Sequence, residues 1–318
     1  MHNKPPTPED WLRTLCGQLV DPQRAWASEA ALRAWLEVAL WRSRDEAFGR
    51  RYAEVCRVPG VPALAYMNRW IQIPDGPLLL AGIQFKGGDP SLPFVELALW
   101  RETPDSEATW SDVMRALERE FAAFRPLSIR LRWPGQAPPP IPGHLEVDQF
   151  LLAGRLGDLA ATPAAETESL TFRQARDCAW YDQFARASKD WKAQHPELAD
   201  EVQVCSRGDF EEALEYGAVV CAWVDGQWAG VAAAMREDER ALSGFAVWEG
   251  LLAASVRGNG WGAALYQALV QTLAAQDPQA ILWGTIHGTN LASRRTAEKC
   301  GLVVVETWWL VQTTQSES

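Results

Sequence analysis

The feature that most constrains the fold is a stretch in which every second residue is glycine, namely Gly258, Gly260 and Gly262. An apolar run over 245–254 leads into it, and a run with helical periodicity over 263–275 follows. Glycines at this density weaken the interior of a helix or a strand. They therefore predict a turn between the apolar run and the helical run. The first N–H groups of a helix lack intrahelical partners and lie at the positive end of its dipole. The turn therefore suits a phosphate or pyrophosphate, and a tight connection that binds no ligand is the alternative.

Two common nucleotide motifs do not match this turn. It lacks the Gly-Lys-Ser/Thr ending of a P-loop, and its glycines do not follow the Gly-x-Gly-x-x-Gly spacing of dinucleotide-binding folds. The residues downstream of the turn therefore have to identify the ligand.

The charge of the chain predicts a partner other than nucleic acid. The formal net charge is −11 and the sequence pI is near 5.0, so the chain repels phosphate backbones and attracts cations such as amines. Ordinary solubility explains the same charge equally well. At 318 residues, the chain is long enough for two domains of common size.

The distribution of cysteine, histidine and apolar residues predicts a cytoplasmic protein without a metal. The six cysteines include no Cys-x-x-Cys pair and the four histidines are scattered, so we expect neither a metal site nor a disulfide framework. The polar segment 1–10 does not resemble a signal peptide, and no apolar run reaches membrane-spanning length. We expect no membrane attachment, and a monomer and a homodimer are both compatible with the sequence.

Helical and strand patterns alternate along the chain. Apolar spacings of three and four residues predict helices over 8–20, 28–55, 110–124, 178–192, 209–216, 263–275 and 291–299. Apolar runs bounded by turn residues predict strands over 67–73, 77–85, 93–101, 127–133, 145–152, 169–174, 218–224, 228–235, 245–254, 280–287 and 302–311.

The two halves of the chain contain similar series of elements. A strand, a helix and two strands over 94–152 match the series over 245–311, and Glu96 falls at the position of Glu249. In the first half, however, residues 101–109 take the place of the glycine turn. A loop with five prolines likewise takes the place of the short helix that follows in the second half.

This repeat predicts two domains. The first covers 1–160 and begins with additional helices, and the second covers 161–318 and holds the glycine turn. A soft boundary rich in alanine and threonine lies over 157–168. An unrelated α+β domain remains the alternative for the first half.

Two motifs in the second half resemble those of the GCN5-related N-acetyltransferase (GNAT) superfamily. Arg257-Gly258-Asn259-Gly260-Trp261-Gly262 resembles its acyl-CoA pyrophosphate loop, with the pattern Arg/Gln-x-x-Gly-x-Gly/Ala. Asn290-Leu291-Ala292-Ser293, followed by Lys299-Cys300-Gly301-Leu302, resembles its second signature. The resemblance covers 169–311 and implies a three-layer α+β fold, in which a mixed, mostly antiparallel sheet is flanked by helices. Two such domains would stand in tandem, the first a degenerate copy without a cofactor loop.

The resemblance also implies acetyl-CoA as the co-substrate, with no metal. Backbone N–H groups at the start of the helix would hold the pyrophosphate, and the pantetheine arm would lie where the preceding strand diverges from its neighbour. The residues implied to contact the cofactor are Leu251, Leu252, Ala253, Arg257, Gly258, Asn259, Gly260, Trp261, Gly262, Ala263, Asn290, Ser293 and Lys299.

An amine must lose a proton before it attacks a thioester, and the sequence offers two candidate bases. Glu249 lies on the strand that leads to the glycine turn, among apolar residues that would raise its pKa. A glutamate at a strand end that faces water is the alternative. His287 lies on the next strand, where a structural histidine is the alternative.

The sequence departs from the family pattern at the general acid. Family members often carry a tyrosine two residues before the Lys-x-Gly element, and Ala297 occupies that position. Tyr266, Ser293 and Cys300 are candidate replacements, and the thiol of CoA is also a leaving group good enough to depart without an acid.

The resemblance implies an N-acetyltransferase that acts on an amine of a small molecule or peptide. One alternative is a non-catalytic acyl-CoA-binding or sensor protein, which Ala297 and the degenerate half suggest. Another is an aminoacyl-tRNA-dependent transferase, against which the acidic composition counts. Aromatic residues that could line an acceptor pocket or form helical core are Trp180, Tyr181, Phe184 and Trp191.

Overall fold

The computed structural model describes residues 7–104, 106–162 and 170–313. The chain forms two compact units, the first made of Met1–Arg24, Glu29–Asp148 and Glu306–Ser318, and the second of Ala25–Ser28 and Gln149–Val305. The predicted repeat of domains 1–160 and 161–318 stays a prediction. Part of the predicted boundary segment, 163–169, lies outside the described residues.

Four helices come first along the chain: α1 (Pro8–Gln18), α2 (Gln23–Trp26), α3 (Glu29–Trp41) and α4 (Glu46–Val55). All belong to unit 1 except the end of α2, and side-chain caps begin α1 and α4. The predicted helix over 28–55 is interrupted, because Asp45 accepts a hydrogen bond from the N–H of Ala47 at 2.9 Å and so caps α4. Thr7 and Asp10 form a capping box at the start of α1.

The sheet of unit 1 contains both strand orientations. Its strands are β1 (Arg69–Gln72), β2 (Leu78–Phe85), β3 (Pro93–Trp100), β4 (Ser128–Pro134) and part of β11 (Val303–Gln312). β1, β2 and β3 pair antiparallel, as do β4 and β11. β3 and β4 pair parallel, joined through α5 (Glu107–Glu120). On one face, Trp100, Trp110 and Phe121 belong to the apolar core.

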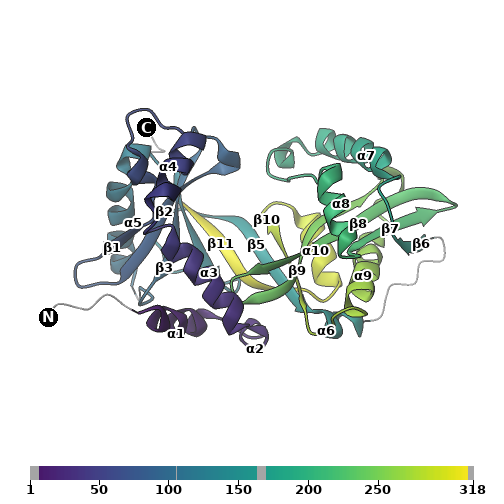
Figure 1. The fold of residues 1–318 in the computed structure, drawn as a ribbon, viewed down its shortest axis with the longest axis horizontal. Coiled ribbons are helices and arrows are strands. Elements are labelled where there is room, and N and C mark those ends of the chain that lie inside the picture. The colour runs from purple at the N-terminus through teal and green to yellow at the C-terminus, as the bar shows by residue number, and fades with distance from the viewer. Residues whose placement is uncertain (1–6, 105, 163–169, 314–318) are drawn as a thin grey trace. The chain divides into compact units, whose positions relative to one another are not determined.

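Unit 2 has a mixed sheet in the order β5-β10-β9-β8-β7-β6. Its strands are β5 (Leu145–Arg155), β6 (Leu170–Gln174), β7 (Val219–Val224), β8 (Gln227–Glu239), β9 (Leu242–Leu252) and β10 (Ile281–His287). β9 and β10 pair parallel, whereas β10 with β5, β9 with β8, β8 with β7 and β7 with β6 pair antiparallel. The predicted class, a mixed and mostly antiparallel sheet with flanking helices, is confirmed (Figure 1).

Helices cover both faces of this sheet. Phe184 of α7 (Tyr181–Gln194) and Phe210 of α8 (Arg207–Glu215) pack with Val219 and Cys221 on one face. Successive residues of a strand point to opposite faces, and the intervening Val220 faces α9 (Trp261–Ala274). The remaining helices are α6 (Leu156–Ala160) and α10 (Leu291–Lys299).

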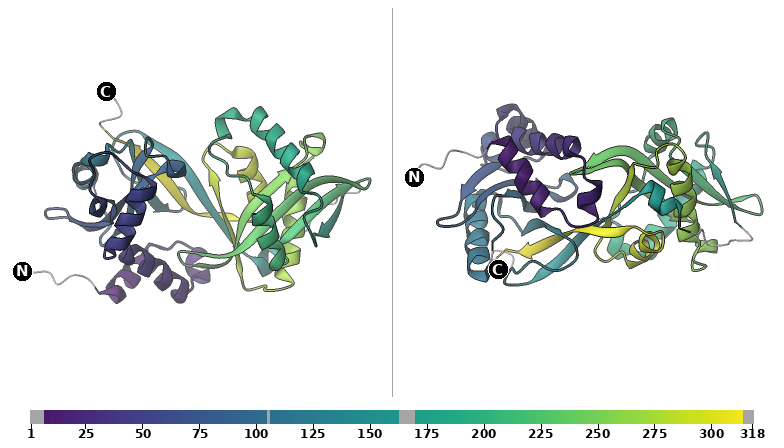
Figure 2. Two further views of the ribbon diagram at one scale, coloured as in Figure 1. Left: turned by 45° about the horizontal axis from the view of Figure 1, so that its top comes forward. Right: turned by 90° about the horizontal axis from the view of Figure 1, so that it is seen from below.

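Each unit contains the last strand of the other half of the sequence. Residues 149–155 of β5 pair with β10 in unit 2, whereas 306–312 of β11 pair with β4 in unit 1. The yellow C-terminal strand in Figure 2 is β11. This exchange is absent from the sequence prediction, because the two last strands are similar apolar runs and nothing local tells which neighbour each will pair with. Among the described residues, no helix is long and apolar enough to cross a membrane.

Candidate functional site

The parallel strands of unit 2 diverge at the site. β9 and β10 pair only at residues 244–246 and 281–283. Beyond that point β9 continues to Leu252 along β8, and β10 continues to His287 along β5. The two strands therefore open a gap between them, the divergence that the resemblance implied.

A cavity of about 500 Å³ lies in this gap, a volume typical of small-molecule sites. Residues from the ends of β9 and β10, from the segment before α8 and from the start of α10 form its wall. Five predicted site residues line it: Glu249, Leu251, His287, Asn290 and Ser293. Leu252 and Ala253, the glycine turn with its flanking residues, and Lys299 are not among the lining residues.

Glu249 is placed in the cavity by a β-bulge. Ala233 pairs with Glu249 but Ala234 pairs with Val247, so Trp248 is an extra residue in β9. A bulge bends the strand and turns its side chains. The Glu249 carboxylate accepts hydrogen bonds from its neighbour Gly250 N–H at 2.9 Å and from Cys205 N–H at 3.4 Å.

The environment of Glu249 suits a base. Burial raises the pKa of its carboxyl to about 7, against the two backbone N–H groups, which lower it. A carboxyl with this pKa is half ionised near neutral pH and can take up a proton. The apolar neighbours recognised in the sequence thus have the predicted effect, while its catalytic role stays a prediction.

Tyr266 approaches the same point from α9. A Cβ atom at Gly250 would lie 2.6 Å from the Tyr266 hydroxyl and 2.5 Å from its ring, so the phenol sits against the strand where only glycine leaves room. Tyr266 lines the cavity, and burial raises its pKa above the ordinary value. Of the other candidate acids, Ser293 lines the cavity, but Cys300 is buried and its thiol donates to the Ala263 carbonyl at 3.2 Å.

His287 is held by its neighbours. Its Nδ1 accepts from the Thr289 N–H at 3.4 Å and lies 2.9 Å from the Thr289 hydroxyl. Its Nε2 lies 3.7 Å from the Glu201 carboxylate. Because Nδ1 accepts a hydrogen bond, Nε2 carries the proton in the neutral ring. The role of His287 as a second candidate base stays a prediction.

The glycine turn has the backbone of an anion site. Gly258 and Gly260 have φ of 84° and 76°, which favour glycine, and space is open where their Cβ atoms would be. Gly260 precedes the first residue of α9, and no side-chain cap covers its N–H groups. Gly262 lies close to Thr296, since its Cβ would be 3.2 Å from that side chain. The third glycine therefore serves helix packing.

Arg257 is fixed beside the turn rather than extended from it. Its Nε donates to the Leu252 carbonyl at 2.8 Å, and its Nη1 donates to Gln194 at 3.2 Å. Its Nη2 is buried without a hydrogen-bond partner, and burial lowers its pKa. The side chain thus ties the turn to α7, with one donor remaining for an anion.

The second motif forms one end of the cavity. Asn290 caps α10, since its side-chain oxygen accepts from the Ser293 N–H at 3.2 Å. Ser293 also lines the cavity, whereas Lys299 is exposed at the other end of α10. The motif therefore brings its first residues to the site and leaves its lysine away from the cavity.

Several residues that line the cavity lie outside the two sequence motifs, and the sequence analysis did not predict them as site residues. Among them are Ser188, Glu201, Cys205 and Gln149. Of the aromatic candidates, Trp191 lines the cavity, but Trp180 and Phe184 belong to the core. Glu201 and Cys205 lie in a segment without helix or strand periodicity, where a polar or thiol side chain was the available signal, whereas Ser188 in α7 and Gln149 in β5 had none. Burial raises the pKa of the Cys205 thiol, which argues against a nucleophilic thiolate.

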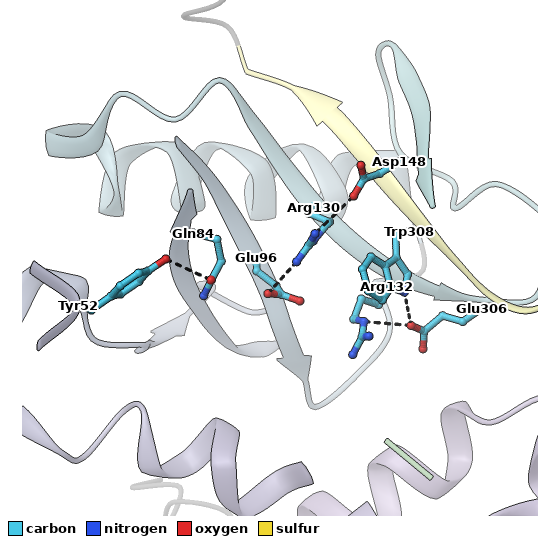
Figure 3. A network of polar contacts seen from close by, with 8 residues as sticks. All are labelled: Tyr52, Gln84, Glu96, Arg130, Arg132, Asp148, Glu306 and Trp308. Atoms are coloured by element: carbon cyan, nitrogen blue, oxygen red, sulfur yellow. Dashed lines mark hydrogen bonds and ion pairs between the residues drawn. The ribbon is translucent and has the colours of Figure 1, made fainter. Parts of the chain in front are cut away.

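Glu96, which the sequence repeat predicts to match Glu249, has the opposite environment. Glu96 on β3 lies 3.2 Å from Arg130, which also lies 3.4 Å from Asp148 (Figure 3). Burial raises the Glu96 pKa, but the arginines outweigh it and hold the pKa below its usual value. An already paired carboxylate with a low pKa is a poor base, so Glu96 lacks the property that suits Glu249 to this role.

Figure 3 shows that this network extends to a second buried pair. Arg132 Nε lies 3.0 Å from Glu306, which accepts from the Trp308 indole N–H at 2.7 Å. Both guanidinium groups lie over the Trp308 ring, at 4.8 and 4.3 Å. These contacts join β4 to β11 within unit 1, so they stabilise the strand exchange.

One family model matches part of the chain. Residues 179–302 match the model of the acetyltransferase (GNAT) family, and no curated protein matches the chain. A GNAT-family acetyltransferase from Colwellia psychrerythraea is 10% identical, with a TM-score of 0.46 over 84% of this chain and 95% of that one.

Two further solved structures are similar. A GCN5-related N-acetyltransferase from Sphaerobacter thermophilus is 12% identical, with a TM-score of 0.46 over 86% of this chain and 94% of that one. A tandem GNAT protein from the clavulanic acid biosynthesis pathway is 11% identical, with a TM-score of 0.41 over 85% and 96%. Within the described residues, no group of His, Cys, Asp and Glu could hold a metal ion.

Proposed function

Because residues 179–302 form a GNAT-family domain, we propose that the protein transfers an acetyl group from acetyl-CoA to the amine of a small molecule or peptide. The observation that carries this proposal is the position of Glu249. A half-buried carboxyl with a pKa of about 7 lies in the gap between two diverging parallel strands. A glycine turn and a helix start follow on the same chain segment.

The residues at this end of the sheet fit the proposed co-substrate. Gly258 and Gly260 leave open space at a helix start without a side-chain cap, and Arg257 keeps one buried donor without a partner. Backbone N–H groups there would hold the pyrophosphate. Beyond Ala246 the edge of β9 no longer pairs with β10, so its backbone can bind the pantetheine arm. Acetyl-CoA supplies an activated thioester.

Glu249 would act on the amine. At neutral pH an aliphatic amine is an ammonium ion with a pKa near 10, and it must lose a proton to become a nucleophile. The ionised Glu249 carboxylate takes this proton, directly or through a water molecule. The two backbone N–H groups that bind the carboxylate keep it oriented toward the cavity.

Tyr266 would stabilise the leaving sulfur without transferring its proton. The leaving thiol has a pKa near that of cysteine, about 8.5. The pKa of the Tyr266 phenol is raised above its ordinary value of about 10. Proton transfer from this phenol to the thiolate is therefore uphill. A hydrogen bond from the hydroxyl to the developing charge remains favourable, and it suits a site in which Ala297 replaces the usual acid.

A substitution in the glycine turn tests this proposal. In Gly260→Asp, a carboxylate stands where the pyrophosphate would bind, so we expect acetyl-CoA affinity to fall at least about 100-fold by calorimetry. Gly60→Asp is the matched control, because Gly60 has nearly the same φ, 78°, and equally open space, but lies in unit 1. Equal affinity in the two variants would contradict the site assignment.

A further inference from the structure

The wall of the cavity is negatively charged. Its carboxylates come from Glu201, Asp209 and Glu249, and its described lining residues include no lysine or arginine. A carboxylate or phosphate entering from the acceptor side would therefore meet like charges without a lysine or arginine to pair with. A cation would be attracted.

Two of these carboxylates accept hydrogen bonds from backbone N–H groups. Asp209 belongs to the capping box of α8 and accepts from the Ser206 N–H at 2.6 Å. Glu249 binds two backbone N–H groups and is the proposed base. Glu201, the third, also has partners within the protein. Its side chain is 23% exposed, lines the cavity, and lies 3.7 Å from His287 Nε2.

An unsatisfied acceptor lies beside the same histidine. Gln149 of β5 pairs directly with His287 of β10, so the two side chains project from one face of the sheet. Gln149 lines the cavity, and its side-chain oxygen is buried without a hydrogen-bond partner. A buried acceptor without a partner costs free energy, and a ligand that donates hydrogen bonds would remove this cost.

An ammonium group meets these requirements together. It carries positive charge, it has only donors, and it can donate to a carboxylate and an amide oxygen at once. A hydroxyl would satisfy Gln149 but not the charge of Glu201. A methyl group would satisfy neither.

We propose that the acceptor is an aliphatic diamine or polyamine, with its reacting amine at Glu249 and a second ammonium group bound by Glu201 and Gln149. This inference rests on the proposed acetyl transfer and specifies its substrate class. The same wall disfavours amino acids, whose carboxylate would find no lysine or arginine among the described lining residues. His287 is here a positioning residue, which orients the Glu201 carboxylate through Nε2.

Three acceptors of matched length test the proposal. Putrescine, pentylamine and 5-aminopentanoate share a reacting amine and a four-carbon chain, and they end in an ammonium, a methyl and a carboxylate group. With acetyl-CoA, we expect kcat/KM for putrescine to exceed that for pentylamine about 10- to 100-fold, the range of a hydrogen bond to a charged group. We expect the value for 5-aminopentanoate to be the lowest of the three.

Substitutions test which residues cause the preference for putrescine over pentylamine. Glu201→Gln and Gln149→Leu should each reduce the ratio of putrescine to pentylamine, with Glu201→Gln bringing it close to one. Glu197→Gln is the matched control, because it removes the same charge from an exposed side chain nearby that does not line the cavity. It should leave the ratio unchanged.

Acetyl-CoA binding, measured by calorimetry without an acceptor, separates the two proposals. If acetyl-CoA does not bind, the proposed function fails and the substrate inference falls with it. If acetyl-CoA binds but putrescine has no advantage, or its advantage survives Glu201→Gln, the inference is wrong and the acetyltransferase proposal stands. The inference is also wrong if acetyl-CoA binds and none of the three amines is acetylated.

Discussion

The substitution Glu249→Gln distinguishes the effect of the ionised Glu249 carboxylate on folding stability from its effect on catalysis. Burial raises the pKa of this carboxyl from 4.5 to about 7, and each pH unit of such a change corresponds to about 1.36 kcal/mol. The ionised side chain therefore destabilises the folded protein by about 3 kcal/mol. Between pH 4.5 and pH 7 the folded state binds more protons than the unfolded state, so stability falls as the pH rises through this range.

The substitution should remove that loss. Glutamine keeps an oxygen that can accept from Gly250 and Cys205, but it does not ionise. At pH 8 we therefore expect Glu249→Gln to be more stable than the original protein, by up to about 3 kcal/mol. At pH 4 the two should differ little. Urea denaturation at both pH values measures the difference, and equal stability at pH 8 would refute the burial argument.

Activity should change in the opposite direction. If Glu249 takes the proton from a bound ammonium ion, log kcat/KM rises with pH to a plateau that begins near pH 7. In Glu249→Gln, the rise of log kcat/KM below pH 7 should disappear. The rate should also fall about 100- to 10,000-fold, the usual contribution of a general base. A profile that rises without a break to the amine pKa, near 10, would show that free amine enters the site and that no base is needed.

Three further predictions concern the neighbouring residues and unit 1. Glu96→Gln leaves part of the Arg130 charge unpaired in a buried site, so denaturation should show a loss of about 2–4 kcal/mol, while acetyl transfer by the folded protein is retained. Gly250→Ala places a Cβ against Tyr266; thermal unfolding should show about 1–3 kcal/mol of destabilisation, and kcat should fall as the phenol is displaced. Because residues 101–109 replace the glycine turn in the first half, calorimetry should give one acetyl-CoA per chain, and two would contradict a degenerate first copy.

Local patterns in the sequence were sufficient to predict most of the elements. The strand predicted over 280–287 is observed at Ile281–His287, and the helix over 291–299 is observed with the same limits. Both are bounded by turn or capping residues, which act within a few positions. The glycine turn was predictable for the same reason, since its conformation depends on residues that are adjacent in the chain.

The geometry inside the cavity was less predictable, because it depends on residues far apart in sequence. The bulge at Trp248 appears only when β9 is paired with β8. The contact between Tyr266 and Gly250 requires α9 to lie against that strand. Gln149 reaches His287 only through the pairing of β5 with β10. No local pattern marks any of these contacts, so candidates for the base could be predicted from the sequence but their surroundings could not.

The exchange of last strands gives the first half of the sequence a role in a site that it cannot form itself. β5 supplies the pairing partner of β10 and places Gln149 and Leu152 in the cavity wall. A segment that starts at residue 161 would lack this strand, leaving the edge of β10 without seven pairing residues and the proposed second ammonium without one of its acceptors. This side of the cavity thus depends on a strand that lies before residue 179, where the match to the GNAT-family model begins. Under the proposed function, substitutions in β5 would alter the acceptor preference while the glycine turn and Glu249 stay the same.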